Sequence, residues 1–278
     1  MPVAFDAAST GSSALQTYSF THTPVGAPTA VVVGIADVGS TVAAGESLVI
    51  GVLYGGRWMN FRRQSFISAQ TYLSVWSLHD PEPGPQTVTV YLTRVLDTAA
   101  ICVSVTGNAA AGPNPPNSTG ASNDFDTPPI TATVTSATDR MVVGFVVSGG
   151  SGAGVNNDAQ VTPGAGQTQR ASVSAPATDL PRLEATTEAG AASVVTNWTF
   201  TNTADWSVVG IDLDGVNIPY TPGGGQYDDR HRFRPSVFHP GQTTAADAPF
   251  GVHRSAWPDD ARDFGQRDNL AGSRTRGL

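Results

Sequence analysis

The chain has 278 residues, of which 40% are hydrophobic and 14% are charged, and its formal net charge is −8. That apolar content is enough for a buried core, so the composition excludes a protein that is disordered throughout. The negative charge argues against nucleic acid and anionic membrane surfaces as partners, because its long-range field repels phosphate.

The chain contains thirty glycines and twenty prolines, which indicates many short strands joined by tight turns in place of long helices. The only cysteine, Cys102, excludes an internal disulfide framework, and its apolar neighbours predict a buried strand thiol. No apolar run approaches the length of a membrane-spanning helix, and residues 1–10 lack the pattern of a secretion signal. We therefore expect a soluble protein without a secretion signal of its own.

Ten segments rich in β-branched or aromatic residues follow one another along the chain, each bounded by turn-forming residues. They are residues 15–22, 29–38, 47–56, 71–79, 86–95, 100–107, 129–136, 141–149, 193–200 and 206–213. Strict alternation in 86–95 and 129–136 predicts strands with one face in solvent, whereas 141–149 is apolar on both faces. We predict an all-β fold, an antiparallel two-layer β-sandwich that is jelly-roll-like.

The domain prediction is one sandwich over residues 1–217, followed by an extended, non-globular arm over residues 218–278. Residues 108–127 are rich in Pro, Asn, Ser and Gly, and we interpret them as a long loop within the sandwich. The alternative is a linker between two smaller domains that divide near residue 115.

Charge and aromatic residues set the arm apart from the body. Residues 1–217 carry seven arginines against sixteen acidic residues, a balance of −9, whereas residues 218–278 carry eight arginines against seven aspartates, a balance of +1. The arm has no hydrophobic period, yet it holds seven aromatic residues, more than a purely solvated tail usually has. We expect it to become ordered on a partner, with aromatic rings in pockets and arginines paired with acidic groups. The candidate partner-binding residues are Arg232, Phe233, Arg234, Phe238, Trp257, Arg262 and Phe264.

No motif of a serine hydrolase, a phosphate-binding loop or a zinc protease occurs, so we predict a protein that is not an enzyme and has no catalytic residue and no cofactor. Asp124 and Asp126 offer oxygen ligands that suit Ca²⁺, an alternative to the prediction that the chain holds no metal. The histidines lack the spacing of a metal site and are expected on the surface. They are His22, His79, His231, His239 and His253.

Two further acidic pairs have the even spacing of one strand face. Asp212 and Asp214 end the last predicted strand, and we expect them on a face exposed to solvent. Glu184 and Glu188 have the same parity, so solvent is again the expected surrounding and a glycosidase pair is not predicted.

The aromatic residues of the body divide into two groups. Trp76, Trp198 and Trp206 lie within apolar strand segments, so we expect them in the core. Tyr54 and Trp58 flank a Gly-Gly turn and are the candidates for a sugar-stacking ligand platform, Trp58 above all because its neighbours are polar.

Four stretches of the body carry a combined pattern: FDAASTGSS with SFTHT, YGGRWMN, TPGAGQTQR, and TEAGAASVVTNWTFTNTADWSVVGIDL. Together they resemble a β-sandwich module of tailed-phage virion structural proteins that is also seen in bacterial surface proteins. The resemblance covers residues 3–214, and its turn glycines and core tryptophans specify a fold better than an activity. Arg62 and Arg63 depart from the pattern, and the arm is not part of it. The resemblance implies no catalytic residue.

The leading hypothesis is a bacteriophage virion structural protein, either a capsid decoration (cement) protein anchored to neighbouring subunits through its arm or a tail-associated protein. Its expected partners are major capsid or tail proteins, with a homo-oligomer expected and no nucleic acid or membrane. Its expected location is the virion, assembled in the bacterial host cytoplasm. The alternative is a carbohydrate- or receptor-binding module of a fibre or surface protein. A polysaccharide-degrading enzyme ranks third, because no suitable carboxylate pair is present.

Overall fold

The computed structural model describes residues 2–38, 48–67, 71–107, 118–123, 130–148, 161–176, 182–200 and 206–213. The chain divides into two compact units, Met1–Phe233 and Arg234–Leu278, and every described residue belongs to the first. The predicted arm and its seven partner-binding candidates lie outside the described residues, so the division at residue 217 stays a prediction.

The described residues form strands and no helix, which confirms the all-β prediction. The strands up to residue 107 are β1 (Ala4–Ser13), β2 (Thr17–His22), β3 (Ala30–Val38), β4 (Val49–Tyr54), β5 (Arg57–Trp58), β6 (Asn60–Ile67), β7 (Thr71–His79), β8 (Gln86–Leu92) and β9 (Thr98–Thr106). Those that follow are β10 (Ser118–Asn123), β11 (Ile130–Thr135), β12 (Met141–Ser148), β13 (Val161–Pro163), β14 (Thr168–Ser174), β15 (Arg182–Ala189), β16 (Ser193–Phe200) and β17 (Trp206–Leu213).

These strands form four antiparallel sheets. Sheet A has the order β1-β9-β3-β7-β6, and sheet B has the order β2-β8-β4-β5. Sheet C has the order β10-β17-β12-β15-β14, and sheet D has the order β11-β16-β13. All strands of sheets A and B precede residue 108 and all strands of sheets C and D follow it, so the chain builds two sandwiches in succession.

Strand order is the same in the two sandwiches. In sheet C, the order β10-β17-β12-β15-β14 corresponds strand by strand to β1-β9-β3-β7-β6 in sheet A. In sheet D, the order β11-β16-β13 corresponds to β2-β8-β4 in sheet B, and no described strand corresponds to β5. Without β6, the first sandwich has two four-stranded sheets, β1-β9-β3-β7 and β2-β8-β4-β5, each alternating early and late strands as in a jelly roll. Each sandwich is antiparallel and jelly-roll-like, as predicted from the sequence, but the chain forms two of them where the prediction had one over residues 1–217.

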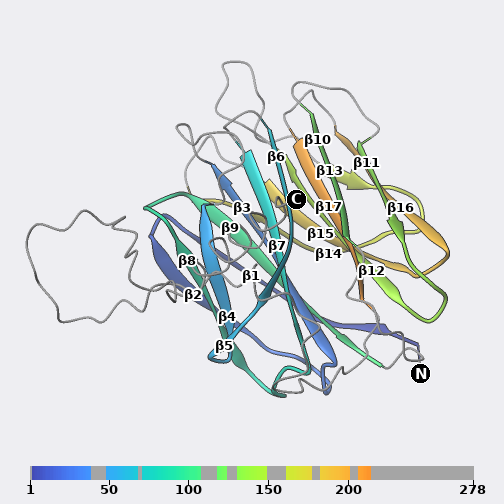
Figure 1. Cartoon of the computed structure of the whole chain (residues 1–278), viewed down its shortest axis with the longest axis horizontal. Coiled ribbons are helices and arrows are strands. Elements are labelled where there is room, and N and C mark those ends of the chain that lie inside the picture. Colours follow the sequence, from blue (N-terminus) through green and yellow to red (C-terminus); the bar gives the residue numbers. More distant parts are fainter. Residues whose placement is uncertain are drawn as a thin grey trace, which may run out of the picture. The chain divides into compact units, whose positions relative to one another are not determined.

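The sheets stack in the order B, A, C, D, as Figure 1 shows from left to right. One buried cluster fills the space between sheets A and B, with Val33, Val52 and Val90 among its members. A second, which includes Val32, Ile101, Val143, Phe145 and Ile211, joins sheet A to sheet C. Smaller clusters lie between sheets C and D. Because sheets A and C are covered on both faces, β3, β9, β12 and β17 are buried on both sides and mostly apolar.

The contacts between sheets A and C follow a two-fold pattern. Strand β1 lies against β14 and β6 against β10, while β9 lies against β15 and β7 against β17. When each strand is replaced by its counterpart in the other sandwich, the contact of β1 with β14 becomes that of β10 with β6, and the contact of β9 with β15 becomes that of β17 with β7. An isologous interface between identical subunits has this property. The body is thus a pseudo-dimer within a single chain.

The segment 108–127, predicted as a long loop, contains β10, which pairs with β17 from Ser118 to Asn123. That part of the prediction was wrong, because small polar residues in this strand hide it from a pattern that counts β-branched side chains. The boundary between the two sandwiches falls between β9 and β10, where the alternative division near residue 115 would place it.

Candidate binding face

The outward face of sheet B is the most distinctive described surface. Strand alternation turns Tyr18, Val52 and Val90 into the first sandwich, so their sequence neighbours point away from it. The outward residues are Thr17, Ser19, Thr21, Leu53, Trp58, Thr87, Thr89 and Tyr91. None of these eight described side chains is charged. Ser19 Oγ and Thr89 Oγ1 are 2.8 Å apart, so these two hydroxyls on adjacent strands form a hydrogen bond.

Trp58 is the aromatic centre of this face. Its ring lies against Gly51 of β4, where an added Cβ would come within 2.6 Å of the indole Cζ3 atom. The absence of a side chain at Gly51 therefore lets the indole rest directly on the strand backbone. The Tyr91 ring lies beside it, with ring centroids 5.6 Å apart and the planes tilted by 44°. Trp58 nevertheless remains 50% exposed.

The hairpin that carries Trp58 is held at its turn. Gly55 and Gly56 have φ values of 55° and 81°, and a two-residue turn with both φ values positive favours glycine and matches the twist of the strands. Arg57 Nη1 donates to the carbonyl oxygen of Asp80 at 2.5 Å, which ties the hairpin to the end of β7. This anchoring fixes the position of Trp58 before any ligand binds.

Tyr54 does not share this face, which corrects one half of the predicted ligand platform. The two-residue turn pairs Tyr54 with Arg57 and Leu53 with Trp58, so Trp58 and Tyr54 point in opposite directions. Tyr54 is 1% exposed and belongs to the core between sheets A and B, where burial raises the pKa of its hydroxyl. Tyr91 takes its place as the second ring, a residue that the sequence interpretation missed.

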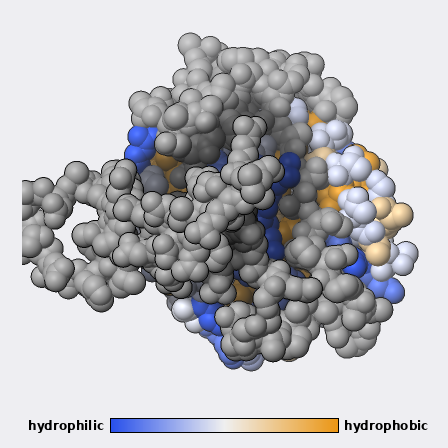
Figure 2. Space-filling model, in the orientation of Figure 1, coloured by the Kyte–Doolittle hydropathy of each residue, from blue (hydrophilic) through white to orange (hydrophobic). Residues whose placement is uncertain are grey.

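The outward face of sheet D provides a natural comparison. Thr131, Thr133 and Val195 point outward there, and Figure 2 shows mainly white and orange atoms at the right edge, where Figure 1 places this sheet. Sheet D lacks a counterpart of β5 and has no outward aromatic side chain among its described residues. The aromatic centre is thus specific to sheet B.

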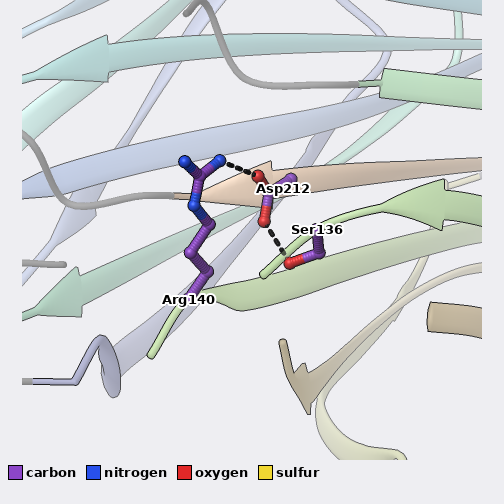
Figure 3. A network of polar contacts seen from close by, with 3 residues as sticks. All are labelled: Ser136, Arg140 and Asp212. Carbon is purple, nitrogen blue, oxygen red and sulfur yellow. Dashed lines mark hydrogen bonds and ion pairs between the residues drawn. The ribbon is translucent and has the colours of Figure 1, made fainter. Parts of the chain in front are cut away.

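Asp212 is buried, which corrects the prediction that it faces solvent. Its side chain points into the second sandwich, where Ser136 Oγ donates to Oδ1 at 2.5 Å and Arg140 Nη1 donates to Oδ2 at 2.7 Å (Figure 3). The two donors lie at either end of the turn between β11 and β12, so one carboxylate fastens that turn to β17. Its partner in the predicted pair, Asp214, lies outside the described residues.

Glu184 is also buried, against expectation. It is 0% exposed, and Arg182 Nε lies 2.9 Å from its Oε1 atom. Burial raises the pKa of Glu184, opposed by Arg182 and Ser172. Both carboxylates of this pair lie on the face of β15 opposite to Leu183 and Ala185, and Glu188 is partly exposed. The ion pair with Arg182 thus engages Oε1 of the Glu184 carboxylate.

Two other titratable groups lie within the first sandwich. His22, predicted on the surface, is buried beside Ser9, with 3.0 Å between Nδ1 and Oγ, and burial lowers its pKa to about 4. Asp37 is fully buried on β3, and burial raises its pKa to about 8, opposed by the positive charge of Arg94. Both groups are therefore neutral in the folded protein near neutral pH.

Replacing Asp37 by asparagine is expected to flatten the pH dependence of stability. Between about pH 4 and pH 8 the folded wild type keeps a proton that the unfolded chain releases, so its free energy of unfolding falls as pH rises through that range. The asparagine side chain does not titrate, so the substitution removes this decline. Urea unfolding of both proteins across the range tests it, and since His22 titrates in both, its contribution cancels. If the free energies of unfolding of the two proteins change with pH in parallel, the pKa of Asp37 is not raised in the folded protein.

The cysteine and three tryptophans of the body lie where the sequence predicts, whereas His79, expected on the surface, is partly buried. Trp76, Trp198 and Trp206 are buried, and so is Cys102, whose thiol pKa is raised by burial. Among the described residues, no group of three or more His, Cys, Asp or Glu side chains is placed to hold a metal ion. Asp124 and Asp126 lie outside them. The described ranges also contain no helix long and apolar enough to cross a membrane.

Comparison with known proteins leaves the resemblance untested, because no family model, curated protein or solved structure matches the chain.

Proposed function

We propose that this protein is a non-catalytic structural protein of a bacteriophage virion, attached to neighbouring subunits by residues 218–278. The observation that carries the proposal is the closed body: sheets A and C bury their facing sides against each other within a single chain. A body that completes its core alone has no need of the arm for folding, and this leaves the arm free for attachment.

Two other observations support a structural role over catalysis. The buried carboxylates of Asp212 and Glu184 are each paired with an arginine of the same sandwich, as is common in structural ion pairs. Jelly rolls also occur in many viral capsid and lectin domains, although this is an analogy at the level of fold. The expected partners remain capsid or tail proteins, with decoration of the capsid as the leading form.

The arm fits attachment by its chemistry. Its aromatic residues and arginines are the types that dominate protein interfaces, and its balance of +1 contrasts with −9 in the rest of the chain. A segment that orders on binding loses conformational entropy, which repeated sites on a symmetric particle offset through multivalency.

Deleting residues 218–278 tests this proposal. We expect the truncated chain to fold with the thermal midpoint of the body unchanged, and to be absent from purified particles that incorporate the full chain. A second variant, with Phe233, Phe238 and Trp257 replaced by serine, should reduce incorporation while keeping the length of the arm. Normal incorporation of the truncated chain would refute the proposal.

A further inference from the structure

We propose that the outward face of sheet B, centred on Trp58 and Tyr91, binds a neutral carbohydrate chain. This inference does not rest on the arm or on the virion role. It rests on three features of the described residues: an exposed indole held in a fixed place, rows of hydroxyl side chains around it, and the absence of charge on that face.

Nothing in the described part of the body explains the exposure of Trp58. The other described tryptophans are buried, as is normal for a side chain whose burial contributes so much to stability. Trp58 is 50% exposed although Gly51 and Tyr91 hold its ring in place. A large aromatic ring that is both exposed and immobilised loses little conformational entropy on binding, which is the property of a ligand contact.

The aromatic pair suits the apolar face of a sugar ring. The face of an indole carries partial negative charge, and the C–H bonds on one side of a pyranose present weakly positive hydrogens. One face of the Trp58 ring lies on the backbone at Gly51, so the opposite face is the one available for stacking. Tyr91, tilted by 44° beside it, adds a second ring and a hydroxyl at the edge of the stacked sugar.

The surrounding hydroxyls suit the polar edge of the same ligand. Ser19 and Thr89 lie in the same row as Leu53 and Trp58, and Thr17 lies in the row of Tyr91 and Gly51. Adjacent strands repeat at about 4.8 Å, so donors and acceptors recur across the sheet as hydroxyls recur along a polysaccharide. Hydroxyls both donate and accept, which suits a ligand made of hydroxyls.

Charge selects the class of carbohydrate. The eight outward residues described on sheet B are neutral, so they offer hydrogen bonds but no positive charge to a carboxylate or sulfate. The balance of −9 over residues 1–217 further disfavours a polyanion. Five of the eight outward residues carry aliphatic hydroxyls, which is unlike the mostly apolar core of a stable protein interface. A neutral polysaccharide meets all three conditions.

Affinity electrophoresis of the full chain tests the proposal, with mannan, galactan, arabinogalactan and laminarin as neutral probes and alginate and heparin as charged ones. At least one neutral probe should retard the wild type, to the same degree at low and high salt. Trp58→Ala should weaken that binding about tenfold, which is about 1.4 kcal/mol, because it removes the stacked aromatic contact. Tyr91→Ala should weaken it less.

Matched variants separate binding from folding. Phe61→Ala removes another exposed aromatic ring, one that contacts Trp76 at the edge of sheet A, and should leave retardation unchanged. Gly51→Val displaces the indole without removing it and should weaken binding while the circular dichroism spectrum stays that of the wild type. Trp58→Tyr, which keeps a ring, should retain part of the affinity.

Several results would overturn the proposal: no retardation by any neutral probe, equal retardation of the wild type and Trp58→Ala, or retardation by the charged probes alone. If no probe binds and Trp58→Ala instead lowers the oligomeric state, the face joins two copies of this chain. Loss of binding on deletion of residues 218–278 would place the site on the arm. Glycan binding that survives this deletion supports the proposal whatever the outcome of particle incorporation.

Discussion

Asp212→Ala is expected to lower the free energy of unfolding by about 3–5 kcal/mol, the range for breaking a buried ion pair by removing one partner. The carboxylate is fully buried, and it receives hydrogen bonds from Ser136 and Arg140. Without it the Arg140 guanidinium, whose side chain is only 17% exposed, loses its counter-charge. The turn between β11 and β12 also loses its tie to β17. Urea unfolding should show a lower midpoint with an unchanged slope.

Two variants identify the cause of that loss. Ser136→Ala removes a single hydrogen bond to a charged group and should cost about 1.5–3 kcal/mol. Replacing Arg140 and Asp212 together by leucine leaves no unpaired buried charge, so it should cost less than Asp212→Ala alone. A cost for Asp212→Ala below about 0.5 kcal/mol would be typical of a solvated surface position and would contradict the network in Figure 3.

Phe145→Ala is expected to cost about 3–5 kcal/mol, because it opens a cavity where sheets A and C pack together. Phe145 is fully buried, and its ring lies against Gly34 of β3, where an added Cβ would overlap it. Gly34→Ala should therefore also destabilise, by about 1–3 kcal/mol, through overpacking. The Phe145 ring fills the space beside Gly34 where a side chain would otherwise lie. The free-energy costs of Phe145→Ala and Gly34→Ala should therefore not be additive.

A double-mutant cycle measures this coupling directly. The methyl group of Gly34→Ala fills part of the cavity left by Phe145→Ala, so the double variant should be more stable than the sum of the single costs predicts, by at least about 0.5 kcal/mol. Additive costs would mean that the two residues do not meet, and the back-to-back packing of the sandwiches would then be wrong. Val52→Ala, in the core between sheets A and B, serves as a control that should be additive with Gly34→Ala.

Much of the fold was predictable because local patterns report local burial. Alternation in 129–136 predicts one wet face, and Ile130–Thr135 indeed alternates between buried and exposed. The apolar run at 141–149 predicts a strand covered on both sides, and every residue of Met141–Ser148 is buried. Strands β1, β5, β6, β10, β13, β14 and β15 lie outside the ten predicted segments. Small and polar residues dominate β1, β10 and β14, and the sheet supplies the pairing that their own propensity does not.

The candidate site was half predictable. The Gly-Gly turn at residues 55 and 56 singles out Trp58, and the parity of a two-residue turn would already have placed Tyr54 on the other side of the sheet. Alternation in 86–95 likewise turns Tyr91 outward. That β8 lies beside β4, so that Tyr91 meets Trp58, depends on a pairing between strands that are distant in the sequence, and local periodicity carries no information about it.

The sequence by itself determined that this chain is all-β, that Cys102 and three of its tryptophans are internal, and that Trp58 is an exposed aromatic residue. These properties follow from side-chain alternation and turn chemistry, which act over a few residues. Only the tertiary structure decided that the sandwich occurs twice, that sheets A and C bury each other, and that the buried Asp212 carboxylate holds the turn between β11 and β12. Those outcomes depend on which face of each sheet packs against another sheet, and this packing is determined by the apolar surface that many strands bury together.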